Sequence, residues 1–369
     1  MKEERKRILK MVEEGKLTVD EALTLMEQLE KSQQTMEQKQ GDLVKELSAY
    51  VKFEEAKKGE PIGSKHQSAK EKVIDFVDSA LKKVKDFDLD FNFGKSIEIS
   101  HIFQHADAYL KDLDIDVANG TVKVVPWDQS DVRVECHAKV YRVETQDQAR
   151  RNFLKEVIFA IEGEKLRFST QQKWMKLDAV IYIPKAKYEN VKIRMFNGPI
   201  ESQNLQVETF KAKTANGKIT VHDLNSKYVE AETANGQITI KRSRVERLEA
   251  ETLNGAILAE GDFKKAELQS FNGNVTCRAE NEPCEFIEAK AATGSINLFV
   301  PDFAAVSGEL RTNLGSFHVD IEGIEVIEEK SEVIQKMMRF KSVKEADSGL
   351  KLAADSKTGA ITLKRSSAW

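Results

Sequence analysis

Cysteine is scarce in this chain of 369 residues, and the number present is odd. The three cysteines are Cys136, Cys277 and Cys284, and no two of them form a C-x-x-C pair. A disulfide framework needs paired cysteines and a structural zinc site needs clustered ligands, so neither is expected. Cys136 belongs to an alternating apolar run, where a free cysteine serves as a small buried hydrophobe.

An excess of charge of one sign is also missing. Lysine and arginine total 57, aspartate and glutamate total 61, and the net charge is -4. A basic surface for nucleic acid is therefore not expected. No apolar run is long enough to span a membrane, so any membrane association is expected to be peripheral.

A secretion signal is not evident at the N-terminus. The first ten residues, MKEERKRILK, lack the apolar segment of a signal peptide. The sequence therefore predicts the cytoplasm as the default location, with a surface or membrane-peripheral location as the alternative.

Residue patterns that carry catalytic chemistry are absent as well. His101 and His105, with Asp107 nearby, could bind a metal from one helix face, but the surrounding HIFQHADAY is typical of a strand, which separates them. No phosphate-binding glycine loop precedes a helix, and no G-x-S-x-G occurs. We expect no enzyme activity, no cofactor and no metal site.

The N-terminal residues predict a helical hairpin. Apolar residues recur at helical spacing on both sides of Gly15, which fits a C-terminal cap, and Thr18 with Glu21 forms a capping box. The apolar residues are Ile8, Met11, Val12, Ala22, Leu25, Met26 and Leu29. So short a unit cannot be stable alone, so it must dock, bind a partner or self-associate.

The chain divides into three predicted segments: the hairpin over residues 1–32, a linker with an amphipathic helix over 33–95, and a β-strand-repeat domain over 96–369. In the second segment, residues 70–93 carry a helical apolar stripe followed by an alternating one. Their lysines and acidic residues balance, which favours a helix packed on the β-domain over a membrane-surface helix.

A short repeat dominates the third segment. Asn-Gly pairs recur, and from Gly198 the glycines of successive turns are 19, 19, 19, 18, 21 and 21 residues apart. The pairs are Asn119, Gly120, Asn197, Gly198, Asn216, Gly217, Asn235, Gly236, Asn254, Gly255, Asn272 and Gly273. Alternating apolar residues on both sides predict strand, tight turn, strand, with glycine supplying positive φ angles.

Two architectures fit such units. Sequential antiparallel hairpins would form a barrel or sandwich, whereas stacked coils would form a β-solenoid of about 19 residues per coil. The constant period and the polar ladder Thr214, Thr233, Thr252 and Ser270 favour the solenoid, so the predicted class is mainly β with a small helical hairpin. The period breaks at residues 131–190, where an inserted helix and hairpin subdomain is expected, and the sequence does not predict the role of 323–350.

Stacked coils would align outward side chains. At the two outward positions before each turn, Lys211 and Lys213 are followed by a predicted acidic stripe. The stripe consists of Glu230, Glu232, Glu249, Glu251 and Glu267. It is either a solvated face that deters edge aggregation or a docking strip for a cationic peptide or Ca²⁺.

The two parts together resemble a known family. The stretch ILKMVEEGKLTVDEALTLMEQLE is similar to the bihelical SHOCT-like module that opens YvlB-type and LiaX-type bacterial proteins. TANGKITV, TANGQITI, FNGNVTC and VKIRMFNGPIES resemble the adhesin-like β-strand repeats that follow it there. The resemblance implies a protein of the cell-envelope stress response in low-GC Gram-positive bacteria. LiaX-like members are implicated in binding cationic antimicrobial peptides and in restraining a signalling pathway, and the family has no known catalytic residues.

Two functional hypotheses follow. The first is a non-catalytic binding or signalling scaffold that recognises a cationic peptide or a regulatory protein, with self-association through the hairpin. The alternative is a polysaccharide-binding or polysaccharide-degrading β-helix protein. That alternative needs outward aromatics for sugar stacking, and Phe299 is almost the only one that the repeats offer.

Overall fold

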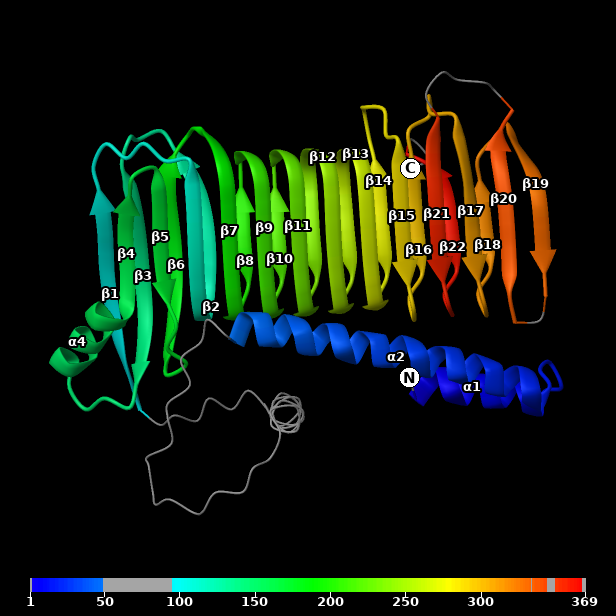
Figure 1. Cartoon of the computed structure of the whole chain (residues 1–369), viewed down its shortest axis with the longest axis horizontal. Coiled ribbons are helices and arrows are strands. Elements are labelled where there is room, and N and C mark those ends of the chain that lie inside the picture. The colour runs from blue at the N-terminus through cyan, green and yellow to red at the C-terminus, as the bar shows by residue number, and fades with distance from the viewer. Residues whose placement is uncertain (1, 49–94, 333, 344–348, 367–369) are drawn as a thin grey trace, which may run out of the picture.

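The computed structural model describes residues 2–48, 95–332, 334–343 and 349–366. Figure 1 shows a long stack of β-coils with two helices along one edge. The predicted helix at 70–93, and the linker beyond residue 48, lie outside the described residues. Among those described, no helix is long and apolar enough to cross a membrane.

The repeats form coils that stack in parallel and in register. Asn216 pairs with Asn235, and Asn235 with Asn254, so each turn lies beside the turn of the next coil. The successive strands are β7 (Lys187–Asn197), β8 (Ile200–Gln203), β9 (Gln206–Asn216), β10 (Ile219–His222), β11 (Asn225–Asn235), β12 (Ile238–Asn254), β13 (Ile257–Asn272), β14 (Val275–Ala279), β15 (Phe286–Ala291) and β16 (Ile296–Val300). The mainly β repeat fold is confirmed, and these parallel pairings rule out sequential antiparallel hairpins for the repeats.

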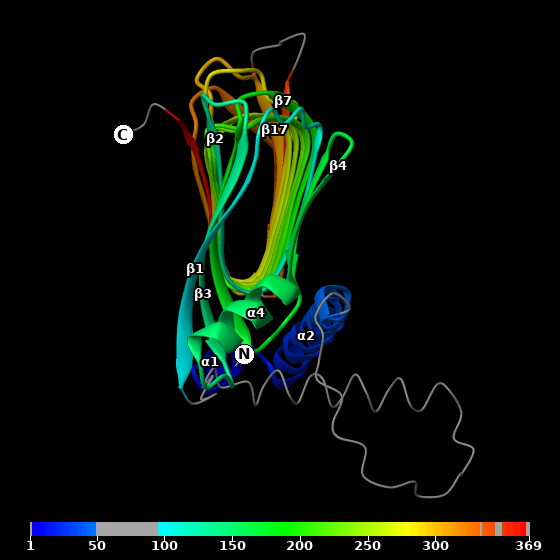
Figure 2. The same ribbon diagram turned by 90° about the vertical axis from the view of Figure 1, so that its left-hand side faces the viewer.

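Two walls enclose one continuous core (Figure 2). The strand before each turn belongs to one wall and the strand after it to the other. The alternating residues Phe210, Ala212, Ile219 and Val221 are fully buried in that core, and the same positions of other coils join them. The period-two pattern therefore sorts side chains into core and surface as the sequence predicts.

Side-chain ladders tie the turns together. Asn235 Nδ2 donates to Asn216 Oδ1 at 2.8 Å, and Asn254 Nδ2 donates to Asn235 Oδ1 at 2.9 Å. Thr233 Oγ1 donates to the carbonyl oxygen of Gly217 at 3.0 Å. These bonds satisfy polar groups at a buried edge, where an unpaired donor would destabilise the fold.

The reason for glycine at the turns differs from the prediction. Of the six predicted pairs, only Gly120, Gly198 and Gly273 have positive φ, and none of the turn asparagines does. A Cβ atom on Gly236 would instead lie 1.8 Å from the carbonyl oxygen of Gly217. Glycine is required because successive coils approach too closely for any side chain.

The opposite edge carries a second, unpredicted ladder. Asn204, Asp223 and Arg242 are 19 residues apart, and each has a left-handed φ between 48° and 55°. Arg242 binds Asp223 through two hydrogen bonds of 2.9 and 2.8 Å. Asn204 and Asp223 have short polar side chains that tolerate this conformation, and Arg242 adopts it while bound to Asp223, so the return turn repeats as well.

At both ends of the stack, the order of the coils in space differs from their order in the sequence. Strand β2 (Asp112–Trp127) lies between the coil of β5 (Lys165–Thr170) with β6 (Met175–Pro184) and the coil of β7 with β8. The C-terminal coil of β21 (Leu350–Ser356) and β22 (Ile361–Arg365) lies between β15 with β16 and the coil of β17 (Val306–Thr312) with β18 (Phe317–Asp320). Part of the predicted insertion at 131–190 is therefore a coil of the stack.

Antiparallel strands and a helix close the two ends. Strands β3 (Val132–Tyr141) and β1 (Ser96–His105) extend one wall, and β4 (Val157–Glu162) extends the other. Helix α4 (Gln146–Glu156), capped by Thr145, covers the core there with Phe153. At the far end, β20 (Lys336–Ser342) and β19 (Ile324–Ser331) pair beyond β17, which gives these two strands a capping role.

The N-terminal hairpin docks on the turn edge. Helices α1 (Lys2–Glu13) and α2 (Val19–Ser48) pack together, and the capping box is confirmed because Glu21 Oε2 accepts from Thr18 N at 2.7 Å. Helix α2 does not end near residue 32 but continues along the stack to Ser48 (Figure 1). Of the three predicted outcomes for the hairpin, which were docking, partner binding and self-association, the structure shows docking.

The close approach of the coils gives a testable prediction. Gly236→Ala should lower the free energy of unfolding by about 3 kcal/mol or more, because the new methyl group would overlap backbone atoms. Gly41→Ala is the matched control. Nothing lies within 4 Å of that position inside α2, so alanine should stabilise the helix by about 1 kcal/mol. Denaturant unfolding followed by circular dichroism would measure both, and equal effects would contradict the packing explanation.

Candidate functional site: an acidic wall beside a docked helix

The five predicted glutamates do lie together on one wall. In-register pairing places Glu230, Glu249 and Glu267 in one row across β11, β12 and β13. Glu232 and Glu251 form the neighbouring row, which continues into Gln269. With Glu288 and Lys290 they line a shallow hollow of about 120 Å³.

Lysines of the preceding coil neutralise the first two glutamates. Lys213 Nζ lies 2.8 Å from Glu230 and 3.0 Å from Glu232, and Lys211 Nζ lies 2.6 Å from Glu230. Burial opposes the charge on Glu230, but the hydrogen bonds from both lysines outweigh it and lower its pKa to about 2. Glu232 has Lys213 alone, and burial raises its pKa.

The other three glutamates also have partners. Arg247 lies 2.6 Å from Glu249 and 3.3 Å from Glu267, and the Tyr228 hydroxyl donates to Glu249 at 2.8 Å. Lys39 of α2 reaches Glu251 at 2.7 Å. Arg247 and Lys39 are about half exposed, so these are surface ion pairs of small net energy that another cation can replace.

A buried charge cluster lies further along the same wall and was not predicted. Arg194 binds Asp116 through short hydrogen bonds and Asp114 Oδ1 at 2.7 Å. Burial raises the pKa of Asp116 despite the guanidinium beside it. The sequence contains a signal for this cluster, because Asp116 lies four residues before Gly120 and Arg194 lies four residues before Gly198. Alignment of the repeats by offset, including the irregular first one, would have found it.

In the part of the chain that the structure describes, this wall consists of paired charged side chains. Among the described residues, no group of three or more His, Cys, Asp or Glu side chains could hold a metal ion. His101 and His105 lie on strand β1, as predicted, and burial lowers the pKa of His101. All three cysteines are buried and free, and burial raises the pKa of Cys136 to about 12, which makes it inert at neutral pH.

Lys213 therefore stabilises the first two glutamates of the stripe, which can be tested. Lys213→Met should lower the free energy of unfolding by about 2–3 kcal/mol, because two partly buried carboxylates lose a donor. Because Glu230 has a folded-state pKa of about 2, its stabilisation is complete above its ordinary value of 4.5 and is lost as pH falls toward 2.

Removing Lys213 should make that acid-side loss of stability shallower. Urea titrations at several pH values would measure it. Lys218→Met, on an exposed turn position, is the control. An equal effect of both substitutions would contradict this role of Lys213.

Comparison with known proteins agrees with the two-part organisation. Residues 110–363 match the family described as Toastrack DUF4097, and residues 3–34 match a SHOCT-like domain. The protein YvlB of Bacillus subtilis (strain 168), described as uncharacterized, is 47% identical over 371 residues, which cover 99% of this chain and 100% of YvlB. The resemblance noted in the sequence is thereby confirmed.

Solved structures show weaker likeness. A protein provisionally described as an adhesin from Bacteroides fragilis NCTC 9343 is 14% identical, with a TM-score of 0.35, over 72% of this chain and 97% of that one. A provisionally described lipid binding protein from Parabacteroides distasonis ATCC 8503 is 11% identical, with a TM-score of 0.36, over 72% and 96%. TM-scores this low support no inference about function. The match over residues 110–363 and the full-length relative show that this chain belongs to the Toastrack DUF4097 family, with a SHOCT-like domain at its N-terminus.

Proposed function

We propose that this protein is a non-catalytic binding scaffold of the cell-envelope stress response, in which a β-solenoid presents a charge-sorted wall to a cationic protein or peptide. The observation that carries the proposal is the in-register row of Glu249, Glu267 and Glu288, with Glu251 in the neighbouring row. Adjacent strands are about 4.8 Å apart, so these carboxylates form a dense negative column. Such a column favours a partner with several cations over one with a single charge.

The neighbouring columns support selective docking. The two coils that precede the stripe carry a basic band in the same two rows, which consists of Lys192, Arg194, Lys211 and Lys213. Lys290 lies in the coil that follows the stripe. Arg194, Lys211 and Lys213 are already paired with acidic side chains. A cationic partner would thus be attracted to Glu249, Glu251 and Glu267, whose present partners are about half exposed. Charges arranged in this way set register and association rate more than affinity, and salt weakens them.

Binding fits the wall better than catalysis does. General acid and base work needs two groups whose environments separate their pKa values in an enclosed site. The pKa values of Glu230 and Glu232 move in opposite directions, but both carboxylates bind Lys213 and line a shallow hollow instead of an enclosed site. For the polysaccharide alternative, the Phe299 ring is not free to stack on a sugar, because the Arg278 guanidinium lies 4.1 Å from its centre.

A short polycation tests the proposal. Deca-lysine should bind the full chain, and Glu249→Gln with Glu267→Gln should weaken binding about fivefold to tenfold, because two charges of the column are removed. Fluorescence anisotropy at 50 and 200 mM salt would measure both affinity and its salt dependence.

The opposite wall supplies the control. Glu201 and Glu260 have lysine partners there, at 3.9 and 3.3 Å. Glu201→Gln with Glu260→Gln removes the same charge and should leave binding unchanged. Equal weakening by both pairs would mean that net charge alone, and not the stripe, attracts the peptide.

A further inference from the structure

An apolar row runs along the turn edge, outside the core. In six turns the residue immediately before the asparagine is apolar and buried. These residues, hereafter the turn-edge row, are Ala118, Phe196, Ala215, Ala234, Leu253 and Phe271. Since successive turns pair in register, the row is straight, and its shape fits one long helix.

Helix α2 lies on this row but fits it unevenly. Its C-terminal residues Leu43, Val44 and Leu47 pack on Ala118, Phe196 and Ala215. At its other end, the hairpin packs around Leu25 and Leu29 and reaches Leu314 and Ile334 of the last coils. The helix is therefore anchored by apolar contacts at two ends.

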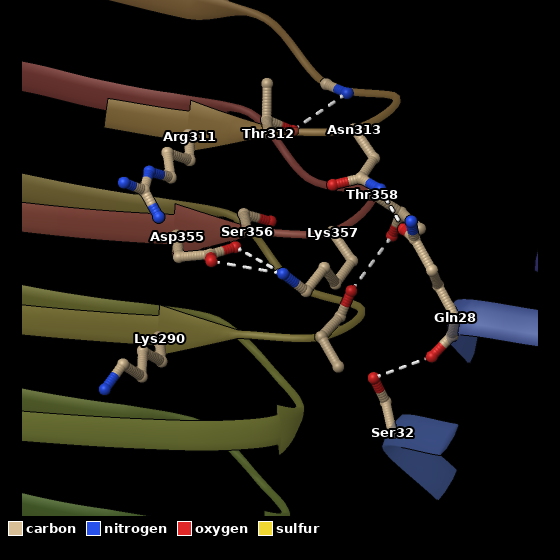
Figure 3. A network of polar contacts seen from close by, with 12 residues as sticks. Gln28, Ser32, Lys290, Arg311, Thr312, Asn313, Asp355, Ser356, Lys357 and Thr358 are labelled. Atoms are coloured by element: carbon tan, nitrogen blue, oxygen red, sulfur yellow. Dashed lines mark hydrogen bonds and ion pairs between the residues drawn. The ribbon is translucent and has the colours of Figure 1, made fainter. Parts of the chain in front are cut away.

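Figure 3 shows the anchor near the last coils. Gln28 of α2 accepts a hydrogen bond of 2.5 Å from Asn313 Nδ2, beside the turn that contains Thr358. Ser32, one turn further along α2, donates its hydroxyl hydrogen to the carbonyl oxygen of Gln28 in its own helix.

Between the anchors the helix and the row do not match. A hollow of about 220 Å³ separates Ser32, Thr35 and Met36 from Leu253 and Phe271. A second hollow, of about 320 Å³, lies between Lys39 with Leu43 and Leu253 with Glu251. Of the four α2 residues that line the first hollow, Ser32, Thr35 and Lys39 are polar and only Met36 is apolar, although Leu253 and Phe271 lie opposite. Such a surface is better complemented by another sequence than by its own helix.

We infer that the turn-edge row is a docking surface for an amphipathic helix of a partner protein, and that α2 covers it in competition with that helix. The partner helix would carry large apolar residues where α2 has Ser32 and Thr35, and a lysine or arginine opposite Glu251, which now binds Lys39. The apolar row lies at the turns and this docking uses only Glu251 of the stripe, so the apolar contacts that carry the inference do not depend on the proposed function.

A second copy of this chain is a poorer occupant. Its α2 has the same two mismatches, whereas the resident α2 is tethered and competes at an effective concentration that reaches the millimolar range for linked modules. A free helix at micromolar concentration must therefore bind more tightly than α2 does. Filling the hollow provides that advantage, because each leucine buried there tightens binding by about tenfold.

The test uses a peptide that the stripe would not attract. Residues 19–48 carry seven acidic and three basic side chains, so a synthetic 19–48 peptide with Ser32→Leu and Thr35→Leu reports on the row. We expect it to bind the full chain at least about tenfold more tightly than the unsubstituted 19–48 peptide does. Fluorescence anisotropy of labelled peptides would measure both.

The same substitutions in the full chain should have the opposite effect. Ser32→Leu with Thr35→Leu in the protein tightens its own cover, so binding of the substituted peptide should weaken about tenfold and hydrogen exchange of α2 should slow. Gln34→Leu with Gln38→Leu, at exposed positions of α2, is the matched control and should change neither.

The outcomes separate this inference from the proposed function. No peptide binding, or equal binding by the tightened and control chains, overturns the inference while deca-lysine binding is unaffected. Loss of the deca-lysine effect alone overturns the proposed function and leaves the helix-docking row in place. Phe271→Ala in the full chain provides a further check, because it should weaken peptide binding and leave deca-lysine binding unchanged.

Discussion

The close contact between successive coils at the Asn-Gly turns is the constraint on which the architecture depends. A Cβ at the turn glycines would lie between 1.7 and 2.1 Å from a carbonyl oxygen of the adjacent coil. Asparagine amides bond from coil to coil beside them, and threonine or serine hydroxyls close the same gap. A slip of one residue would destroy all of these interactions at once, so the register of every coil is fixed.

Fixed register turns sequence positions into columns on the surface. A residue type repeated at one offset becomes a continuous feature, whether it is the glutamate stripe, the basic band or the turn-edge row. A surface feature that spans many coils can therefore be specified by the residue type at one or two positions of the repeat. The same rule explains why the charges do not repel one another strongly, because Lys211, Lys213 and Arg247 lie within reach of the glutamates in adjacent coils.

Much of this could be predicted from the sequence, because stacking is a local and periodic property. The Asn-Gly period predicted the coils, the alternation predicted the core, and the offsets predicted that the glutamates lie together. Features without a period were predicted less well, and the polar residues after residue 31 indicated only a weak helix followed by a linker. The length of α2 depends on tertiary contacts of Leu43, Val44 and Leu47 with the row, since its polar middle gives little signal of its own.

Other misses have equally physical causes. The prediction that glycine supplies positive φ followed from hairpin turns, but a stacked turn needs glycine for space, which only the neighbouring coil reveals. The cations that neutralise the stripe come partly from the same repeats and partly from Lys39, more than 200 residues away. Burial of Arg194 with Asp116 likewise joins positions 78 residues apart across the break in the period.

The order of coils at the ends has a consequence for stability. Terminal repeats of a stack usually unfold first, because each has one neighbour. Here the C-terminal coil of β21 and β22 has a neighbour on both sides, and β2 near the other end does too. The coil of β17 and β18 can join the stack only when β21 and β22 are in place. The first and last coils of the sequence are therefore interior, and local opening is directed to the capping strands and to α2.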